Sequence, residues 1–255
     1  MWTVRDSLTL AAASEPPSEA VVVLSGILAL LITVVGWPML THVITIAHEG
    51  GHATAASLSG GRVNFVELFR TGDGNTDFNY SGGKGAIAFI GSAGYIGPSV
   101  FGLLGSFLLT RGQFEAILWI SLVLVGILLL NVKNPFGWLS AILTGIVLFV
   151  MARYAPDGLQ ELFAVTWVWF LLFGGYGDVL GLRKLRRLAK AAKKPDKKSD
   201  ARKLGDKTGI PAPFWVALFW LCAVAALILG GGIMLGLVEL PSPPPVPAAP
   251  RPTPT

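Results

Sequence analysis

The sequence predicts an all-α polytopic membrane protein with about six transmembrane helices and a small β-hairpin after the first. Its mean hydropathy is +0.63, and only 14% of its 255 residues are charged, against about 25% in a soluble domain. Several uncharged stretches also reach the ~20 residues that a helix needs to cross a bilayer. Together these observations predict one membrane-embedded bundle rather than several domains.

The chain begins with a segment, residues 1–19, that we expect to be flexible. Its apolar part is short and broken, and Glu15, Pro16, Pro17 and Glu19 follow. A secretory signal peptide has a longer uninterrupted apolar region, so this segment does not resemble one.

The first apolar run, residues 20–58, is nearly twice as long as one crossing requires. As a continuous helix it would measure roughly 60 Å. The run either forms one helix kinked at Pro38 or breaks into two segments near residues 36–38. We expect one kinked crossing, because a tight hairpin inside lipid would leave backbone polar groups unsatisfied.

A polar stretch at residues 60–83 follows this run. Polar and apolar residues alternate at 62–65 and at 76–80, and Thr71-Gly72-Asp73-Gly74-Asn75 between them is typical of a turn. This pattern predicts a β-hairpin at the membrane surface.

Five further apolar stretches predict the remaining spans, at residues 85–109, 114–131, 136–153, 161–181 and 213–238. The expected organisation is a transmembrane core at 20–182, a basic loop at 183–210 and a C-terminal transmembrane helix at 211–239. Residues 240–255 form a Pro-rich tail that we expect to be disordered.

Positive charge is concentrated between the last two spans. Residues 183–207 contain twelve Lys and Arg against Asp196, Asp200 and Asp206. Because short Lys/Arg-rich loops stay in the cytoplasm, this loop predicts that residues 60–84 and 132–135 are also cytoplasmic. Residues 110–113 and the C-terminal tail then lie outside. The charge also predicts contact with anionic lipid head groups, whereas nucleic-acid binding has no supporting motif.

Three polar residues inside the first apolar run suggest a metal site. His48 and His52 are four residues apart, so on a helix both imidazoles lie on one face and can reach one metal ion. Glu49 beside them completes the H-E-x-x-H pattern, in which the carboxylate acts as general base on a zinc-bound water. The alternative is a polar cluster that joins helices, although one polar residue would suffice for that.

A hydrolytic zinc site needs a third protein ligand. Cys222 is the single cysteine, so a Cys-based zinc site and an intramolecular disulfide are both excluded. His42 is six residues before His48 and points away from it on a helix. The predicted topology leaves Asp178 as the acidic candidate near the inner end of a later span, with pairing to Arg183 or Lys184 as its alternative role. Asn131 and Asn134 reach the same side, and Asp157 and Glu161 belong to the outer face.

The motif and its context resemble the site-2 protease family of zinc intramembrane metalloproteases. The resemblance rests on His48-Glu49-Gly50-Gly51-His52, the hairpin after it, Ala93-Gly94-Tyr95-Ile96-Gly97-Pro98-Ser99, and Asn131-Val132-Lys133-Asn134-Pro135-Phe136-Gly137, and it covers roughly residues 28–150. The family's Asn/Pro segment leads into an Asp-Gly pair, which is missing here. The chain is therefore more similar to a divergent bacterial branch, in which a later Gly-rich segment ends in Asp.

The resemblance implies a zinc-dependent endopeptidase that cleaves a transmembrane or membrane-proximal substrate. The implied site has His48, His52 and Asp178 as Zn²⁺ ligands and Glu49 as catalytic base. The implied location is a multi-pass protein of the bacterial plasma membrane. Two other functions are consistent with the residues: a catalytically inactive relative that binds a membrane partner, and a metal transporter or sensor.

Overall fold

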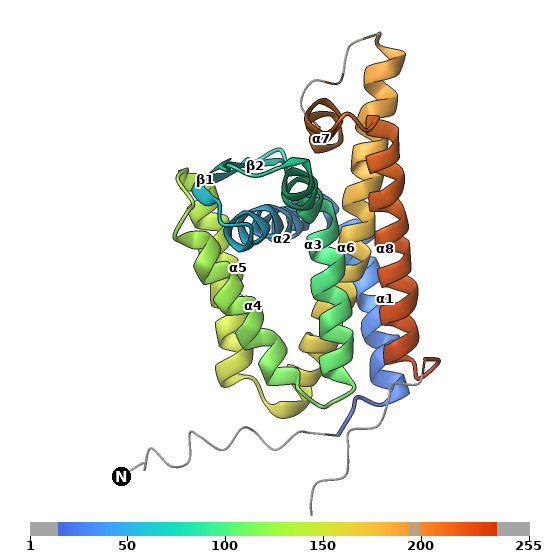
Figure 1. Cartoon of the computed structure of the whole chain (residues 1–255). Coiled ribbons are helices and arrows are strands. Elements are labelled where there is room, and N and C mark those ends of the chain that lie inside the picture. The colour runs from blue at the N-terminus through green and yellow to red at the C-terminus, as the bar shows by residue number, and fades with distance from the viewer. Residues whose placement is uncertain (1–14, 194–195, 197–198, 239–255) are drawn as a thin grey trace, which may run out of the picture.

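The computed structural model describes residues 15–193, 196 and 199–238 as a helical bundle with one small sheet. Figure 1 shows two groups of upright helices, with a horizontal helix and the hairpin across the upper end. The segment expected to be flexible, except for residues 15–19, and the Pro-rich tail lie outside the described residues.

The first apolar run forms two helices, α1 (Glu19–Val35) and α2 (Trp37–Leu58), which meet at 105°. The expected single kinked helix is therefore wrong, because the run breaks at Gly36 into two helices, which together form one broken candidate span. Gly36 separates them: a Cβ there would lie 2.7 Å from the carbonyl oxygen of Ile32. Pro38 then occupies the first turn of α2, where its missing N–H costs nothing.

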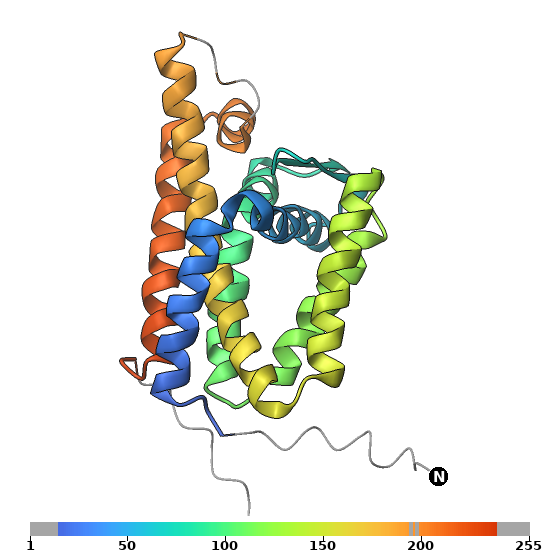
Figure 2. The same cartoon turned by 180° about the vertical axis from the view of Figure 1, so that it is seen from behind.

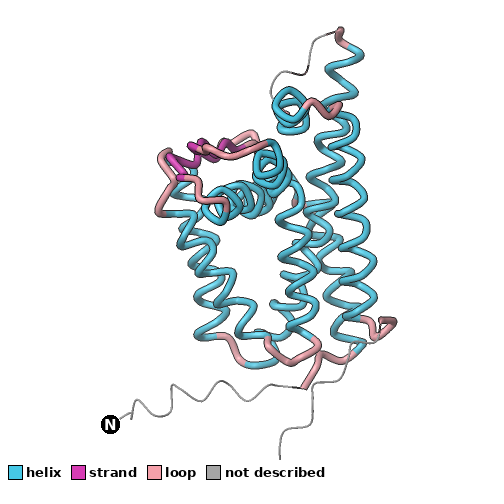
Figure 3. The backbone as a smooth tube through the Cα atoms, viewed as in Figure 1, coloured by secondary structure: helices cyan, strands magenta, loops and turns pink. Residues whose placement is uncertain are grey.

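The hairpin after α2 is present as expected. Strands β1 (Arg62–Leu68) and β2 (Gly74–Asn79) are antiparallel, with an irregularity between Val63 and Phe65. Figure 3 shows this sheet lying over α2. The sheet covers α2 on the side that faces away from the bundle.

Five more long helices follow, and they match the predicted spans closely. They are α3 (Lys84–Leu109), α4 (Phe114–Leu129), α5 (Pro135–Tyr154), α6 (Asp157–Ala191) and α8 (Ala212–Met234). Among the described residues, α3, α5, α6 and α8 are long and apolar enough to span a membrane, and α1 with α2 forms one further, broken candidate. The apolar helix α4 has 16 residues, about 24 Å, and is short for a crossing.

The basic segment is more ordered than a loop. Helix α6 continues through the first basic residues to Ala191, and a nine-residue helix, α7 (Asp200–Thr208), precedes α8. Figures 1 and 2 show the end of α6 projecting beyond α8, with α7 beside it. The prediction of an open loop at 183–210 missed these helices because the high charge masked the apolar positions of α7, namely Ala201 and Leu204, which are buried.

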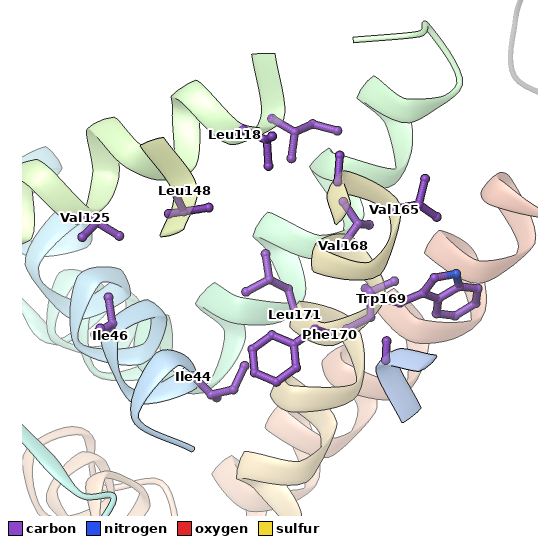
Figure 4. Packing of buried hydrophobic residues seen from close by; sticks show 14 of the residues in the cluster. Ile44, Ile46, Leu118, Val125, Leu148, Val165, Val168, Trp169, Phe170 and Leu171 are labelled. Atoms are coloured by element: carbon purple, nitrogen blue, oxygen red, sulfur yellow. The ribbon is translucent and has the colours of Figure 1, made fainter. Parts of the chain in front are cut away.

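The hydrophobic core lies where α2, α4, α5 and α6 approach one another. Ile44, Val125, Leu148 and Phe170 are among its buried side chains (Figure 4). This packing places α2 across the bundle, with one face on the core and the other beneath the hairpin.

Helix α3 crosses α2 at very short range through glycines. Gly51 of α2 lies against the backbone of Ala93, and Gly97 of α3 lies against the backbone of Ala47 and Gly51. Small residues let helix backbones approach closely. By contrast, a Cβ at Gly50, the neighbour of Gly51, would meet nothing within 4 Å.

The two adjacent glycines should therefore respond in opposite ways to alanine. We expect Gly51→Ala to lower the free energy of unfolding by about 1–3 kcal/mol, because the added methyl group overpacks the crossing. Gly50→Ala should be neutral or stabilising by up to about 1 kcal/mol, because alanine is the better helix former. Thermal unfolding of both variants in detergent micelles measures the difference, and equal melting temperatures would contradict the proposed crossing.

Candidate metal centre

Helix α2 presents His48, Glu49 and His52 toward the hairpin side of the molecule. All three side chains are buried, with residue exposures of 7%, 4% and 6%. The helical spacing places the two imidazoles one turn apart on the same face, and their Nε2 atoms are 3.2 Å from each other.

A carboxylate from α7 faces both rings. The Oδ2 atom of Asp200 lies 3.6 Å from Nε2 of His48 and 3.7 Å from Nε2 of His52. Among the described residues, one ligand atom from each of these three side chains lies within 4.8 Å of the others. Two imidazole nitrogens and one carboxylate oxygen form a donor set that suits zinc.

The other nitrogen of each ring meets an oxygen that can only accept a hydrogen bond. Nδ1 of His48 lies 2.7 Å from Oδ2 of Asp178, and Nδ1 of His52 lies 2.7 Å from the carbonyl oxygen of Ile90. Neutral rings therefore carry their proton on Nδ1 and leave the Nε2 lone pair free. Outer partners of this kind orient metal-binding histidines, so the arrangement fits a cation between the Nε2 atoms.

Gly94 of α3 leaves space beside the paired nitrogens. A Cβ at this position would overlap Nε2 of both His48 and His52. The absence of a side chain here keeps open the volume that a cation would need. Next to it, the ring of Tyr95 makes an edge contact with His48 at 4.5 Å between centroids, which helps to fix the imidazole plane.

The hairpin holds Glu49. Thr76 of β2 donates a hydrogen bond from Oγ1 to Oε2 of Glu49 at 2.6 Å. Gly74 lies beside the same carboxylate, since a Cβ there would be 2.5 Å from Oε1. The carboxylate is therefore oriented by one hydroxyl and confined by the backbone of the strand.

These groups line a cavity of about 930 Å³ between α2, the hairpin, α3, α6 and α7. Its wall includes Asp73 and Asp77 on the hairpin side and Lys203 and Lys207 on α7. A second cavity of about 600 Å³ lies on the opposite face of α2 and is lined almost wholly by apolar residues. Helix α2 thus separates a polar space from an apolar one.

Asp200 is suited to a cation because it remains ionised. Burial alone raises the pKa of its carboxyl group, but hydrogen bonds and positive charge from His48 and His52 in their protonated form more than offset this. The pKa therefore lies well below its ordinary value.

The structure brings together most of the residues predicted from the sequence. His48, Glu49 and His52 line one cavity, and Asp178 reaches it from α6. However, the Asp178 carboxylate lies against Nδ1 of His48, on the far side of the ring from His52.

The remaining candidates lie elsewhere. The Asn134 side chain bonds the backbone N–H and C=O of Leu68 in β1, and the Asn131 side chain donates to the carbonyl of Ile127. His42 stacks edge-on against Phe136. Asp157 begins α6, at the end of the helix opposite to its basic segment.

Sequence reasoning missed Asp200, which it counted only in the charge balance of the basic segment. The residue in the sequence that could have indicated it is Ser199, which immediately precedes Asp200. Ser199 caps α7 and accepts a hydrogen bond from the backbone N–H of Arg202. A serine followed by the apolar residues Ala201 and Leu204 at helical spacing predicts a short helix with one packed face. Such a helix could bring a carboxylate to the site.

Comparisons with known proteins identify a family for the chain. Neither the curated proteins nor the solved structures include a match to the chain. A family model described as Peptidase M50B-like matches residues 20–230, which include His48, Glu49, His52, Asp178 and Asp200. The chain therefore belongs to the Peptidase M50B-like family, and this match confirms its resemblance to the site-2 proteases as a multi-pass membrane protein.

Proposed function

We propose that this protein is a zinc-dependent intramembrane endopeptidase whose zinc ligands are His48, His52 and Asp200. The observation that carries the proposal is the convergence of two Nε2 atoms and one carboxylate oxygen within 4.8 Å. Membership of a metallopeptidase family supports the same function.

Glu49 is the proposed general base. A zinc ion held by the three side chains would supply Lewis acidity, which would lower the pKa of a bound water to about 7. Glu49 takes a proton from the water that attacks the substrate carbonyl, and Thr76 orients its carboxylate.

Asp178 has a different proposed role from the one that the sequence predicted. Because its carboxylate accepts from Nδ1 of His48, it orients the ring rather than completing the ligand set. Asp200 takes the ligand role, since its Oδ2 atom faces both Nε2 atoms.

The substrate is proposed to bind as an extended strand along β2. Backbone atoms of Val66 in β1 pair with residues Asn131 and Lys133, so they face away from β2. Thr76 lies opposite Val66 in the antiparallel ladder, and the two form a non-hydrogen-bonded pair, so the backbone groups of Thr76 point away from β1. The backbone N–H and C=O of Thr76 therefore face the cavity side, where an unwound substrate segment can add a strand.

The competing functions predict other features. A transporter needs polar groups on both sides of the metal site. The apolar cavity on the opposite face of α2, however, is lined by no charged residue. An inactive relative would have no need for the contact that holds Glu49 toward the cavity. A peptidase accounts for both the apolar cavity on one side of α2 and the contact between Thr76 and Glu49 on the other.

Metal content should separate ligands from orienting residues. We expect purified wild type to hold one zinc per chain, and His48→Ala and Asp200→Ala to lose it. Asp178→Asn should retain zinc with affinity reduced by about 10–100-fold, as expected for an outer-shell partner. Elemental analysis and competitive titration measure this. Asp206→Ala on the exposed side of α7 is the control, and equal zinc in every variant would remove the proposed site.

Glu49→Gln should separate chemistry from binding. The amide cannot take a proton, so we expect cleavage to fall by about 10²–10⁴-fold while zinc content stays unchanged. Mass spectrometry of fragments from a panel of single-pass membrane proteins measures cleavage. If the wild type and the Glu49→Gln variant both bind zinc and neither cuts any protein of the panel, the result would favour a catalytically inactive relative.

Strand addition predicts an alternating pattern in the substrate. In a cleaved peptide, N-methylation of every second residue should block cleavage, because those N–H groups pair with β2, and methylation of the residues between should not. Cleavage rates of a singly N-methylated peptide series provide the measurement. Equal tolerance at all positions would argue against pairing with β2.

A further inference from the structure

Asp200 comes from α7, a short helix that follows the basic end of α6 and is not one of the candidate membrane spans. Its carboxylate must nevertheless meet two histidines on α2. Whatever fixes the start of α7 relative to α6 therefore controls whether the donor set is complete.

Three side chains connect the end of α6 to the start of α7. Arg186 of α6 forms an ion pair with Asp196, and its Nη1 lies 3.4 Å from Oγ of Ser199. Asp196 in turn accepts from the backbone N–H of Ser199 at 3.1 Å and from its hydroxyl at 2.5 Å. We call Arg186, Asp196 and Ser199 the α6–α7 latch.

The latch ends at the residue before Asp200. Ser199 is buried and serves as the N-cap of α7, so its position sets the direction in which the helix begins. Asp200 is the first helical residue. A shift of the cap would therefore move its carboxylate directly.

A second contact sets which oxygen of Asp200 faces the histidines. Lys203, one turn along α7, pairs with Oδ1 of Asp200 at 3.0 Å. The other oxygen, Oδ2, is the one that faces the two rings. The latch places the residue, and Lys203 orients its carboxylate.

The rest of α7 is held by packing. Ala201, Leu204 and Thr208 are buried, and the Leu204 side chain lies close to Gly91 of α3. Loss of the latch should therefore leave α7 attached while loosening its first turn, where Asp200 lies.

We propose that Arg186 is a positioning residue for the metal centre, acting through Asp196 and Ser199 to hold Asp200 against His48 and His52. This inference rests on the proposed function, because it requires Asp200 to bind the metal. It assigns the basic segment a role in building the site as well as in topology.

A double-mutant cycle on zinc affinity tests the proposal in the full-length protein in detergent. We expect Arg186→Ala to weaken zinc binding by about 10–100-fold, the range for lost outer partners of a metal site. In an Asp200→Ala background, where only weak binding by the two histidines remains and is titrated at higher zinc concentration, the same change should have no further effect. Arg186→Lys, which keeps the charge but lacks the guanidinium fork, should fall between wild type and Arg186→Ala.

Two matched controls separate this effect from general destabilisation. Arg187→Ala removes an adjacent exposed cation, and Arg202→Ala breaks the exposed Arg202–Asp206 ion pair on α7 itself. Both should bind zinc as wild type does. The visible spectrum of bound Co²⁺, which reports the ligand set, should change in Arg186→Ala and stay unchanged in both controls.

Each outcome bears on a different claim. Wild-type zinc affinity in Arg186→Ala, with zinc lost in Asp200→Ala, would overturn the latch and leave the proposed function standing. Equal weakening by Arg186→Ala with and without Asp200 would also overturn it. Unchanged affinity in Asp200→Ala would overturn both claims. If Arg186→Ala does not fold, Asp196→Asn makes the same test from the other side of the ion pair.

Discussion

The close crossing of α2 and α3 is the constraint on which the rest of the site depends. Gly51 brings the α3 backbone against α2, and Gly94 then lies where any side chain would overlap the paired imidazole nitrogens. The same crossing carries the carbonyl of Ile90 to Nδ1 of His52. One packing contact thus leaves room for a cation and also orients one of the rings that face it.

The donor set is assembled from elements that are far apart in the chain. Helix α2 supplies the histidines and Glu49, while α6 supplies Asp178 and α7 supplies Asp200. The hairpin supplies the hydroxyl that holds Glu49. A buried cluster of ionisable groups is costly in a membrane protein unless the groups pair or bind an ion, and here each of these five contacts an oppositely charged or hydrogen-bonding partner.

The sequence predicted those parts of the site that depend on local periodicity. Four-residue spacing is sufficient to place His48 and His52 on one helix face, and long apolar runs are sufficient to predict spans. Asp200 could not be found in this way, because its approach to the two rings depends on how α7 folds back over α3. Asp178 was found from the predicted topology but meets the other nitrogen of His48, a distinction set by tertiary geometry alone.

The sharp turn at Gly36 gives α2 two unlike faces. His48, Glu49 and His52 face the polar cavity, whereas Gly50 and Ala53 line the apolar one. On a helix parallel to the membrane normal, such a polar stripe would extend across a range of membrane depths. Lying across the bundle, α2 instead keeps its whole polar stripe on the side of the hairpin and the basic segment. A polar cavity therefore borders Glu49 on that side while the opposite face of the same helix borders an apolar one, which is the separation that the proposed hydrolysis within a membrane would require.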